Sequence, residues 1–278
     1  MLFITSDLHY GADRLGDAAV RKMAREMAKT GPDDIFVVAG DIACDDLRFK
    51  LCLELFRAVP GKKLFVRGNH ELWTDGREKS LTRFHRLADE AERYGFLCLD
   101  ATNSFQADEY TLVGAMGWYD YAYRDHSLGI GLDSYERKTF PGHPYPLWND
   151  ALMVDLGEKD AAWTNRELRR LEDKLKLLES RTRVVAILHH VPVDGLLPPP
   201  TPDMPEDVRF ARAFLGSPEF GRILCGHPGT KAVFCGHAHL ENSIHINDIP
   251  FTCVGSDDER KMLLEYDGSD IRRRVFQT

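Results

Sequence analysis

The sequence predicts an α/β fold, because short apolar runs alternate with segments of helical periodicity. Three such runs, at residues 2–5, 35–39 and 64–66, lie in the first part of the chain, and apolar residues at helical spacing follow each of them. The run at 35–39 contains no polar residue, which is typical of a strand that is covered on both faces. Strands and helices that alternate in this way build the layers of an α/β protein.

The helices between these strands end at glycine and proline. Gly31-Pro32 ends the first predicted helix and Pro60-Gly61 ends the second, since proline cannot continue a helix and glycine favours its end. In the second helix, Leu47, Leu51 and Leu55 are expected to form the buried stripe.

The second half of the chain predicts further strands and helices. Apolar runs predict strands at residues 97–99, 111–116, 184–188 and 232–235. The sequence Thr164-Asn165-Arg166-Glu167 has the form of a capping box and predicts the start of a long helix. Two short helices are expected at 207–215 and 218–225. From residue 244 onward we expect antiparallel strands, with turns at Asn247-Asp248 and Asp267-Gly268.

Residues 117–160 form a long insert without clear periodicity. This insert is rich in aromatic residues, and a loop of such length within a domain is usually functional. We expect one domain over residues 1–278, in which the insert forms a wall of the substrate pocket through Trp118, Tyr119 and His126. The alternative is that these aromatic side chains are buried against the sheet.

Composition excludes several classes of protein. The chain has 36 Lys and Arg against 44 Asp and Glu, a formal charge of −8, whereas a nucleic-acid binder needs a surplus of cations. The chain has no apolar run of about eighteen residues, so we expect no membrane-spanning helix. At the N-terminus no basic segment precedes an apolar one, so we expect no signal peptide. The chain contains neither a dinucleotide-binding fingerprint nor a P-loop, so the sequence predicts no nucleotide cofactor. The six scattered cysteines, without a C-x-x-C motif, are typical of buried thiols in a reducing compartment, so we expect a cytoplasmic protein.

Potential metal ligands follow five of the predicted strands. They are Asp7, His9, Asp41, Asn69, His189, His237 and His239. Because the carboxyl ends of adjacent strands converge on one crevice, we expect these side chains to face a common point. The pairs Asp7-x-His9 and His237-x-His239 place both side chains on one side only if the backbone there is extended.

The donor set suits two metal ions. Carboxylate, imidazole and amide oxygen match Mn, Fe or Zn better than Cu(I) or an iron–sulfur cluster. Seven donors are too many for one ion that keeps an open position, and they predict two ions about 3.5–4 Å apart. Asp41 is the expected bridge, because its carboxylate has two oxygens.

In their order along the chain, these motifs resemble those of the calcineurin-like metallophosphoesterases. The matching blocks are Asp7-x-His9, Gly40-Asp41, Gly68-Asn69-His70-Glu71, His189 and Gly236-His237-Ala238-His239. The resemblance extends from residue 2 to about residue 240. It implies a four-layer β-sandwich, in which helices flank two mixed sheets, whereas the alternation alone suggests a simpler parallel sheet.

The resemblance also implies a role for each residue. Asp7, His9, Asp41 and His239 would hold one ion, and Asp41, Asn69, His189 and His237 the other. His70 would bind no metal but lie beside the leaving group. The fourth block leaves two alternatives open: a His-x-Pro motif would select His190, whereas the end of the strand at residue 188 favours His189, which we prefer.

Together these features predict a metal-dependent phosphoesterase. A hydroxide that bridges the two ions is expected to attack phosphorus in line, while His70, oriented by Asp41 or a nearby carboxylate, assists departure of the leaving group. The expected partner is a small phosphomonoester or phosphodiester, for example a nucleotide. The segment Gly40–Asp46 lacks the arginine of the Ser/Thr protein phosphatases, which disfavours that activity. The net negative charge predicts no basic groove, which disfavours a nuclease. A scaffold of the same fold that has lost catalysis is the remaining alternative, and it should also have lost ligands.

Overall fold

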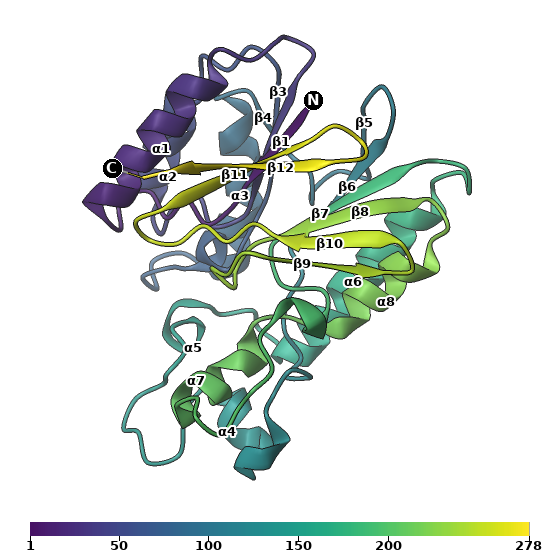
Figure 1. Cartoon of the computed structure of the whole chain (residues 1–278). Coiled ribbons are helices and arrows are strands. Elements are labelled where there is room, and N and C mark those ends of the chain that lie inside the picture. Colours follow the sequence, from purple (N-terminus) through teal and green to yellow (C-terminus); the bar gives the residue numbers. More distant parts are fainter. Residues whose placement is uncertain (278) are drawn as a thin grey trace.

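The apolar runs form two six-stranded sheets in the computed structural model, which describes residues 1–277 (Figure 1). In spatial order, the first sheet contains β12 (Ile271–Phe276), β11 (Lys261–Tyr266), β1 (Leu2–Thr5), β2 (Ile35–Ala39), β3 (Lys62–Val66) and β4 (Phe96–Cys98). The second contains β5 (Phe105–Gln106), β6 (Thr111–Ala115), β7 (Val184–Leu188), β8 (Thr230–Cys235), β10 (Ile249–Cys253) and β9 (Asn242–Ile246).

Both sheets are mixed. In the first, β1 pairs in parallel with β2 and antiparallel with β11, and in the second β8 pairs in parallel with both β7 and β10, whereas β9 is antiparallel to β10. The prediction of two mixed sheets flanked by helices is therefore confirmed, and the simpler parallel sheet suggested by alternation alone is wrong.

Alternating side chains of each strand serve two different cores. In β2, Phe36 and Val38 pack with α1 (Arg14–Met27), α2 (Asp46–Leu55) and α3 (Ser80–Glu92), while Ile35 and Val37 pack between the sheets. This follows from the period of two along a strand. On the far side, α6 (Asp160–Lys176) and α8 (Pro218–Gly226) cover the second sheet. The chain thus forms the four expected layers.

The buried stripe predicted for the second helix is on the wrong face. Leu47 and Leu51 are 67% and 49% exposed, whereas Phe49, Cys52 and Leu53 of α2 are buried. Apolar residues occupy both faces of this short helix, so periodicity alone could not choose between them. The larger Phe49 packs with the sheet instead.

The long helix begins before the predicted capping box. Helix α6 starts at Asp160, so Thr164 lies within the helix and is buried. Its hydroxyl donates to the carbonyls of Asp160 and Tyr119, at 3.0 and 2.8 Å, and therefore caps nothing. The threonine instead ties the helix to the insert.

The insert folds into a lobe beside the two sheets, seen at the bottom of Figure 1. It contains the short helices η2 (His126–Leu128), α4 (Leu132–Glu136) and α5 (Asp150–Met153), and packs with α7 (Glu206–Ala211) and η4 (Arg212–Phe214). Trp118 and Tyr119 are fully buried in the core of this lobe. The expectation that they form the pocket wall is wrong, because these large rings build the lobe itself.

No helix among residues 1–277 is long and apolar enough to cross a membrane. The six cysteines, all within this part of the chain, form no disulfide there, and four of them are buried.

Candidate active site

The loops predicted to carry ligands meet at one edge of the two sheets. The loops after β1, β2 and β3 of the first sheet contribute four side chains, and those after β7 and β8 of the second contribute three. Backbone hydrogen bonds join neighbouring loops: the amide of Asp7 donates to the carbonyl of Gly40 at 3.0 Å, and that of Gly236 to the carbonyl of His189 at 2.9 Å. The carboxyl ends of adjacent strands thus place donors from both sheets around one point.

One group of donors comprises Asp7, His9 and His239, whose ligand atoms all lie within 4.8 Å of one another. The Nε2 atoms of His9 and His239 are 3.0 Å apart, and Nε2 of His239 lies 3.5 Å from Oδ1 of Asp7. Three buried or half-buried donors from both sheets therefore point at one position.

A second group comprises Asp41, His189 and His237, within the same limit. Nε2 of His189 lies 3.2 Å from Oδ2 of Asp41, 3.2 Å from Oδ1 of Asn69 and 3.1 Å from Nδ1 of His237. Oδ2 of Asp41 also lies 3.9 Å from Nε2 of His9, a member of the first group. The carboxylate of Asp41 therefore stands between the two groups.

The outward ring nitrogens of the second group are bound to backbone carbonyls. Nδ1 of His189 donates to the carbonyl of Ala39 at 2.9 Å, and Nε2 of His237 donates to that of Phe214 at 3.2 Å. Each ring therefore directs its other nitrogen at the cluster, the orientation that histidine ligands of metals have. The residues present fit two metal ions.

His190 points elsewhere. Its Nδ1 donates to the carbonyl of Met116 at 3.2 Å, and its Nε2 has no hydrogen-bond partner in the described part of the chain. Of the two alternatives that the sequence left open, the structure brings His189 into the cluster.

The charges at the centre interact strongly. Burial alone would raise the pKa of Asp41, but the neighbouring imidazoles of His189 and His70 hold it well below its usual range. Burial would lower the pKa of His189, but the carboxylate of Asp41 outweighs it and raises that pKa to about 10. For His237, burial and the charge of His189 together lower the pKa to about 3. The cluster thus combines anionic carboxylates with a neutral imidazole at His237 and a protonated one at His189, and a cation that binds His189 must displace its proton.

The backbone at the ligands is left-handed, which corrects the expectation of extended backbone. The positive φ values occur at Asp7 (51°), His9 (41°), Asp41 (54°), His237 (68°) and His239 (52°). A left-handed residue other than glycine costs roughly 1–2 kcal/mol. Sharp turns at the strand ends, rather than strand continuation, therefore direct these side chains into the site.

Two glycines next to the ligands leave room for neighbouring ligands. A Cβ at Gly40 would lie 2.3 Å from Nδ1 of His189, and a Cβ at Gly68 would lie 2.1 Å from Oδ1 of Asp41. Both distances are far below van der Waals contact. The Gly-Asp and Gly-Asn pairs of the sequence are therefore required by the close packing of the five loops.

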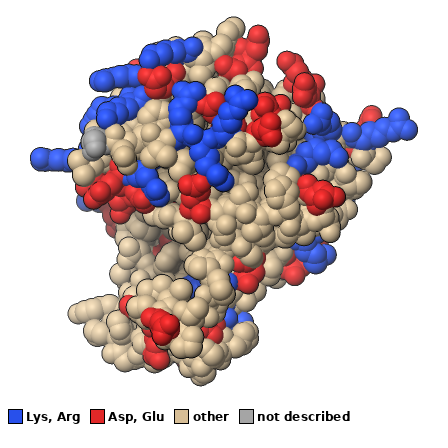
Figure 2. All heavy atoms as spheres, in the orientation of Figure 1, with Lys and Arg blue, Asp and Glu red and all other residues tan. Residues whose placement is uncertain are grey.

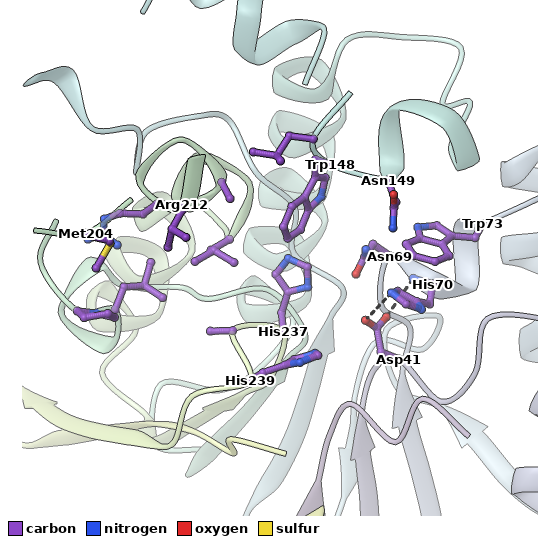
Figure 3. A pocket seen from close by; sticks show the side chains of 17 residues that line it. Asp41, Asn69, His70, Trp73, Trp148, Asn149, Met204, Arg212, His237 and His239 are labelled. Atoms are coloured by element: carbon purple, nitrogen blue, oxygen red, sulfur yellow. Dashed lines mark hydrogen bonds and ion pairs between the residues drawn. The ribbon is translucent and has the colours of Figure 1, made fainter. Parts of the chain in front are cut away.

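His70 lies beside Asp41. Its amide donates to Oδ1 of Asp41 at 3.0 Å, and its Nε2 is 3.7 Å from Oδ2 (Figure 3). Its ring stacks on Trp73, with the ring centroids 3.6 Å apart. Nδ1 lies 3.1 Å from Sγ of Cys44. Burial foremost lowers the pKa of His70 to about 3.

Cys44 is the partner of Nδ1 of His70, in addition to Asp41, which is one of the two orienting groups that the sequence suggested. Burial, with the nearby Asp41 and Glu71 carboxylates, raises the pKa of Cys44 to about 12, so the thiol stays protonated. A thiol that donates to Nδ1 leaves the proton of the neutral imidazole on Nε2. This tautomer directs an N–H of His70 toward the cavity.

Glu71 is a site residue for which sequence reasoning assigned no role. Its buried carboxylate accepts from the amides of Asp41 (3.0 Å), Ile42 (2.9 Å) and Gly68 (2.7 Å). Burial and the charge of Asp41 raise the pKa of Glu71 to about 7. Its position directly after Asn69-His70 was the available signal. Glu71 fixes the loop after β2 against the loop after β3.

Asp150 is a second residue that sequence reasoning missed. It lies in α5 of the insert, is buried, and accepts from four donors. These are Nδ2 of Asn69 (3.0 Å), Nε1 of Trp73 (2.7 Å), Nε1 of Trp148 (2.9 Å) and the hydroxyl of Tyr119 (3.0 Å). Since the amide nitrogen of Asn69 faces Asp150, its oxygen faces His189. Asp150 thus orients a candidate ligand.

We expect Asp150→Asn to weaken metal binding about 10–100-fold, as loss of a residue that orients a ligand typically does. Asparagine has one acceptor oxygen in place of two, so some of the four donors lose their partner and Asn69 can rotate. Titration of the metal-depleted protein with Mn²⁺ measures the change.

The matched control is Asp160→Asn. Asp160 is also buried in the lobe and accepts from Trp118 and Tyr121, but has no contact with the ligand cluster. Both variants should melt earlier. Equal metal affinity in the two variants would contradict the orienting role of Asp150.

A cavity of about 490 Å³ opens beside the cluster. One side contains Asp41, Asn69, His70 and Trp73, and the other contains residues of the 197–215 segment, with His237 and His239 between them (Figure 3). Ala238 and three residues of the insert, Leu147, Trp148 and Asn149, complete the lining. The insert therefore does form a wall, but through these three residues rather than Trp118, Tyr119 or His126.

A family profile and known proteins match this chain. The profile of the calcineurin-like phosphoesterases matches residues 2–241. The [acyl-carrier-protein] phosphodiesterase PptH of Mycobacterium tuberculosis is 42% identical over 79 residues, which are 28% of this chain and 22% of that protein. The chain thus matches less than a quarter of the length of this curated relative.

Solved structures resemble the whole fold. The crystal structure of the phosphopantetheinyl hydrolase PptH from M. tuberculosis has a TM-score of 0.69 at 20% identity, covering 93% of this chain and 90% of that one. A dimetal phosphatase from Danio rerio has a TM-score of 0.56 at 13% identity, covering 99% and 95%. At these identities the likeness concerns the fold.

Proposed function

The chain belongs to the calcineurin-like phosphoesterase family, and from that premise we propose that it hydrolyses a phosphate ester at the donor cluster between its two sheets. The observation that carries the proposal is the convergence of two donor groups on opposite sides of the Asp41 carboxylate. A fold that had lost catalysis would have no reason to keep seven donors in this arrangement, together with the backbone strain at five of them.

We assign the donors to two ions. Asp7, His9, Asp41 and His239 would hold one, and Asp41, Asn69, His189 and His237 the other, with Asp41 shared. Carboxylate, imidazole and amide oxygen favour Mn, Fe or Zn. When bound, such ions act as Lewis acids on phosphoryl oxygens and lower the pKa of water to about 7, which supplies a nucleophile at neutral pH.

His70 has the role of general acid in this proposal. Its Nε2–H faces the cavity, and its ring is held by stacking on Trp73 and by the thiol of Cys44. The anionic phosphate of a bound ester favours the imidazolium form of His70. The leaving oxygen takes the proton from Nε2 of this imidazolium as its bond to phosphorus breaks, and the ring becomes neutral. Trp73 and Cys44 therefore fix the direction in which the proton is delivered.

The substrate we propose is a small phosphomonoester or phosphodiester. The relation to a phosphodiesterase that acts on acyl carrier protein favours a diester among these. The single-domain organisation and the cytoplasmic location stay predictions.

Metal loading combined with a substrate panel tests the proposal. We expect metal analysis of the protein to find about two ions per chain, and chelation to abolish hydrolysis that Mn²⁺ then restores. The panel contains phosphomonoesters, phosphodiesters and cyclic nucleotides. A protein that binds two ions but hydrolyses none of these esters, with any of the three metals, would count against the activity.

A further inference from the structure

We propose that the cavity binds an uncharged, apolar organic group attached to a single phosphate, so that the substrates are phosphate esters of this class rather than nucleoside di- or triphosphates or sugar phosphates. This inference rests on the proposed function, because it requires that the phosphate lie at the donor cluster. It concerns what the rest of the cavity recognises.

The cavity has a polar floor and an apolar wall. Outside the donor cluster and His70, ten of the twelve lining residues are apolar: Trp73, Leu147, Trp148, Leu197, Pro198, Met204, Val208, Ala211, Leu215 and Ala238. The other two are Asn149 and Arg212. Figure 3 shows Met204 and its neighbours on the side of the cavity opposite Asp41 and His70, with His237 and His239 between. A ligand whose phosphate reaches the floor therefore extends its other end along apolar surface.

The cavity offers at most one cation for a second phosphate. Among the described lining residues, Arg212 is the sole Lys or Arg; its Nη2 is paired with Asp194 at 2.6 Å, and its buried Nη1 has no partner there. Helix α7, which contributes Val208, begins with Glu206 and Asp207. On the face shown in Figure 2, the lower lobe carries few Lys or Arg side chains. Polyphosphate recognition depends on Arg or Lys side chains, so these surroundings disfavour a second phosphate.

Part of the apolar wall is rigid and part is adaptable. Trp148 is held by its hydrogen bond to Asp150 and stacks on Phe214, with centroids 5.4 Å apart. Met204, on the opposite wall, has a flexible thioether side chain that adapts to irregular shapes. A volume of about 490 Å³ lies within the usual range of small-molecule sites, about 300–1,000 Å³. The wall can thus accommodate an alkyl chain or a ring beside the phosphate.

A series of p-nitrophenyl phosphodiesters with one leaving group and one negative charge tests the proposal. The second ester group is methyl, hexyl or a nucleoside. Each buried CH₂ contributes about 0.8 kcal/mol, so partial burial of the hexyl chain should raise kcat/KM at least about tenfold over methyl. The nucleoside ester, with its polar sugar, should gain less than hexyl. Adenosine diphosphate, assayed by phosphate release, should be a poorer substrate than hexyl phosphate.

Val208→Glu places a charge on the apolar wall at a half-exposed position, where folding should tolerate it. We expect it to reduce the ratio of hexyl to methyl kcat/KM at least about fivefold, since it removes contact with only a few CH₂ groups. Leu177→Glu, at the exposed end of α6, is the matched control and should leave that ratio unchanged.

Three outcomes separate the possibilities. Equal kcat/KM for the methyl and hexyl esters, or a preference for the diphosphate, would overturn the inference while leaving the phosphoesterase activity intact. An unchanged ratio in Val208→Glu, with the same melting temperature as the parent protein, would also overturn it. Absence of hydrolysis of every ester by the metal-loaded protein would instead contradict the proposed function.

Discussion

Asp41→Asn is expected to lower kcat at least about 10³-fold and to deplete both metal positions, whereas Asp7→Asn depletes one. Removal of a single preorganised electrostatic partner typically costs about 10²–10³ in kcat, and the Asp41 carboxylate serves both donor groups. Its Oδ2 lies 3.2 Å from Nε2 of His189 and 3.9 Å from Nε2 of His9. Asp7 lies among the donor atoms of the group that contains His9 and His239, and its contact with the second group is to the backbone amide of His237, not to a donor atom.

Measuring metal content per chain and steady-state rates for the two variants side by side tests whether both metal positions share Asp41. Both substitutions keep the size and shape of the side chain, so each variant serves as a control for the other. A milder effect of Asp41→Asn than of Asp7→Asn, in rate or in metal content, would contradict a shared position for Asp41. Circular dichroism should show the same fold in both.

His70→Ala should retain both metals and lower turnover about 10²–10⁴-fold with an alkyl ester, the usual contribution of general acid–base catalysis. A nitrophenyl ester needs little protonation of its leaving group, so its hydrolysis should fall much less. The difference between the two substrates separates proton donation from a merely structural role, which would lower both rates alike.

His85→Ala is the matched control, because His85 is an exposed histidine of α3 outside the cavity. It should leave both rates and the metal content unchanged. If His70→Ala loses metal together with activity, or slows both substrates equally, His70 is not the general acid.

Local sequence patterns predicted the strands well and their arrangement less well. The run at 184–188 forms β7 with those bounds, because a continuous apolar segment has no alternative to burial. The pairing of β1 with β11, more than 250 residues away, has no local signal. Only the resemblance to a known family implied the second sheet.

In the site, the motifs that follow the strands predicted the metal-donor residues. They did not predict the residues that hold these donors in place. Asp150 lies 81 residues from Asn69, in a segment without periodicity, and no spacing rule links the two. Trp118 and Tyr119 were assigned to the pocket because they follow a strand directly. Large aromatic rings, however, contribute most when they are fully buried, and the lobe needed a core of its own.

At the five left-handed ligand positions, the residue that would favour stability differs from the residue that the chemistry requires. Glycine would adopt this conformation without cost, and so would relieve roughly 1–2 kcal/mol at each position, yet glycine has no ligand atom. A substitution to glycine at one of these positions would therefore relieve backbone strain but remove a ligand. Backbone conformation alone would favour glycine at these positions. Selection for hydrolysis is therefore needed to retain the ligands Asp7, His9, Asp41, His237 and His239.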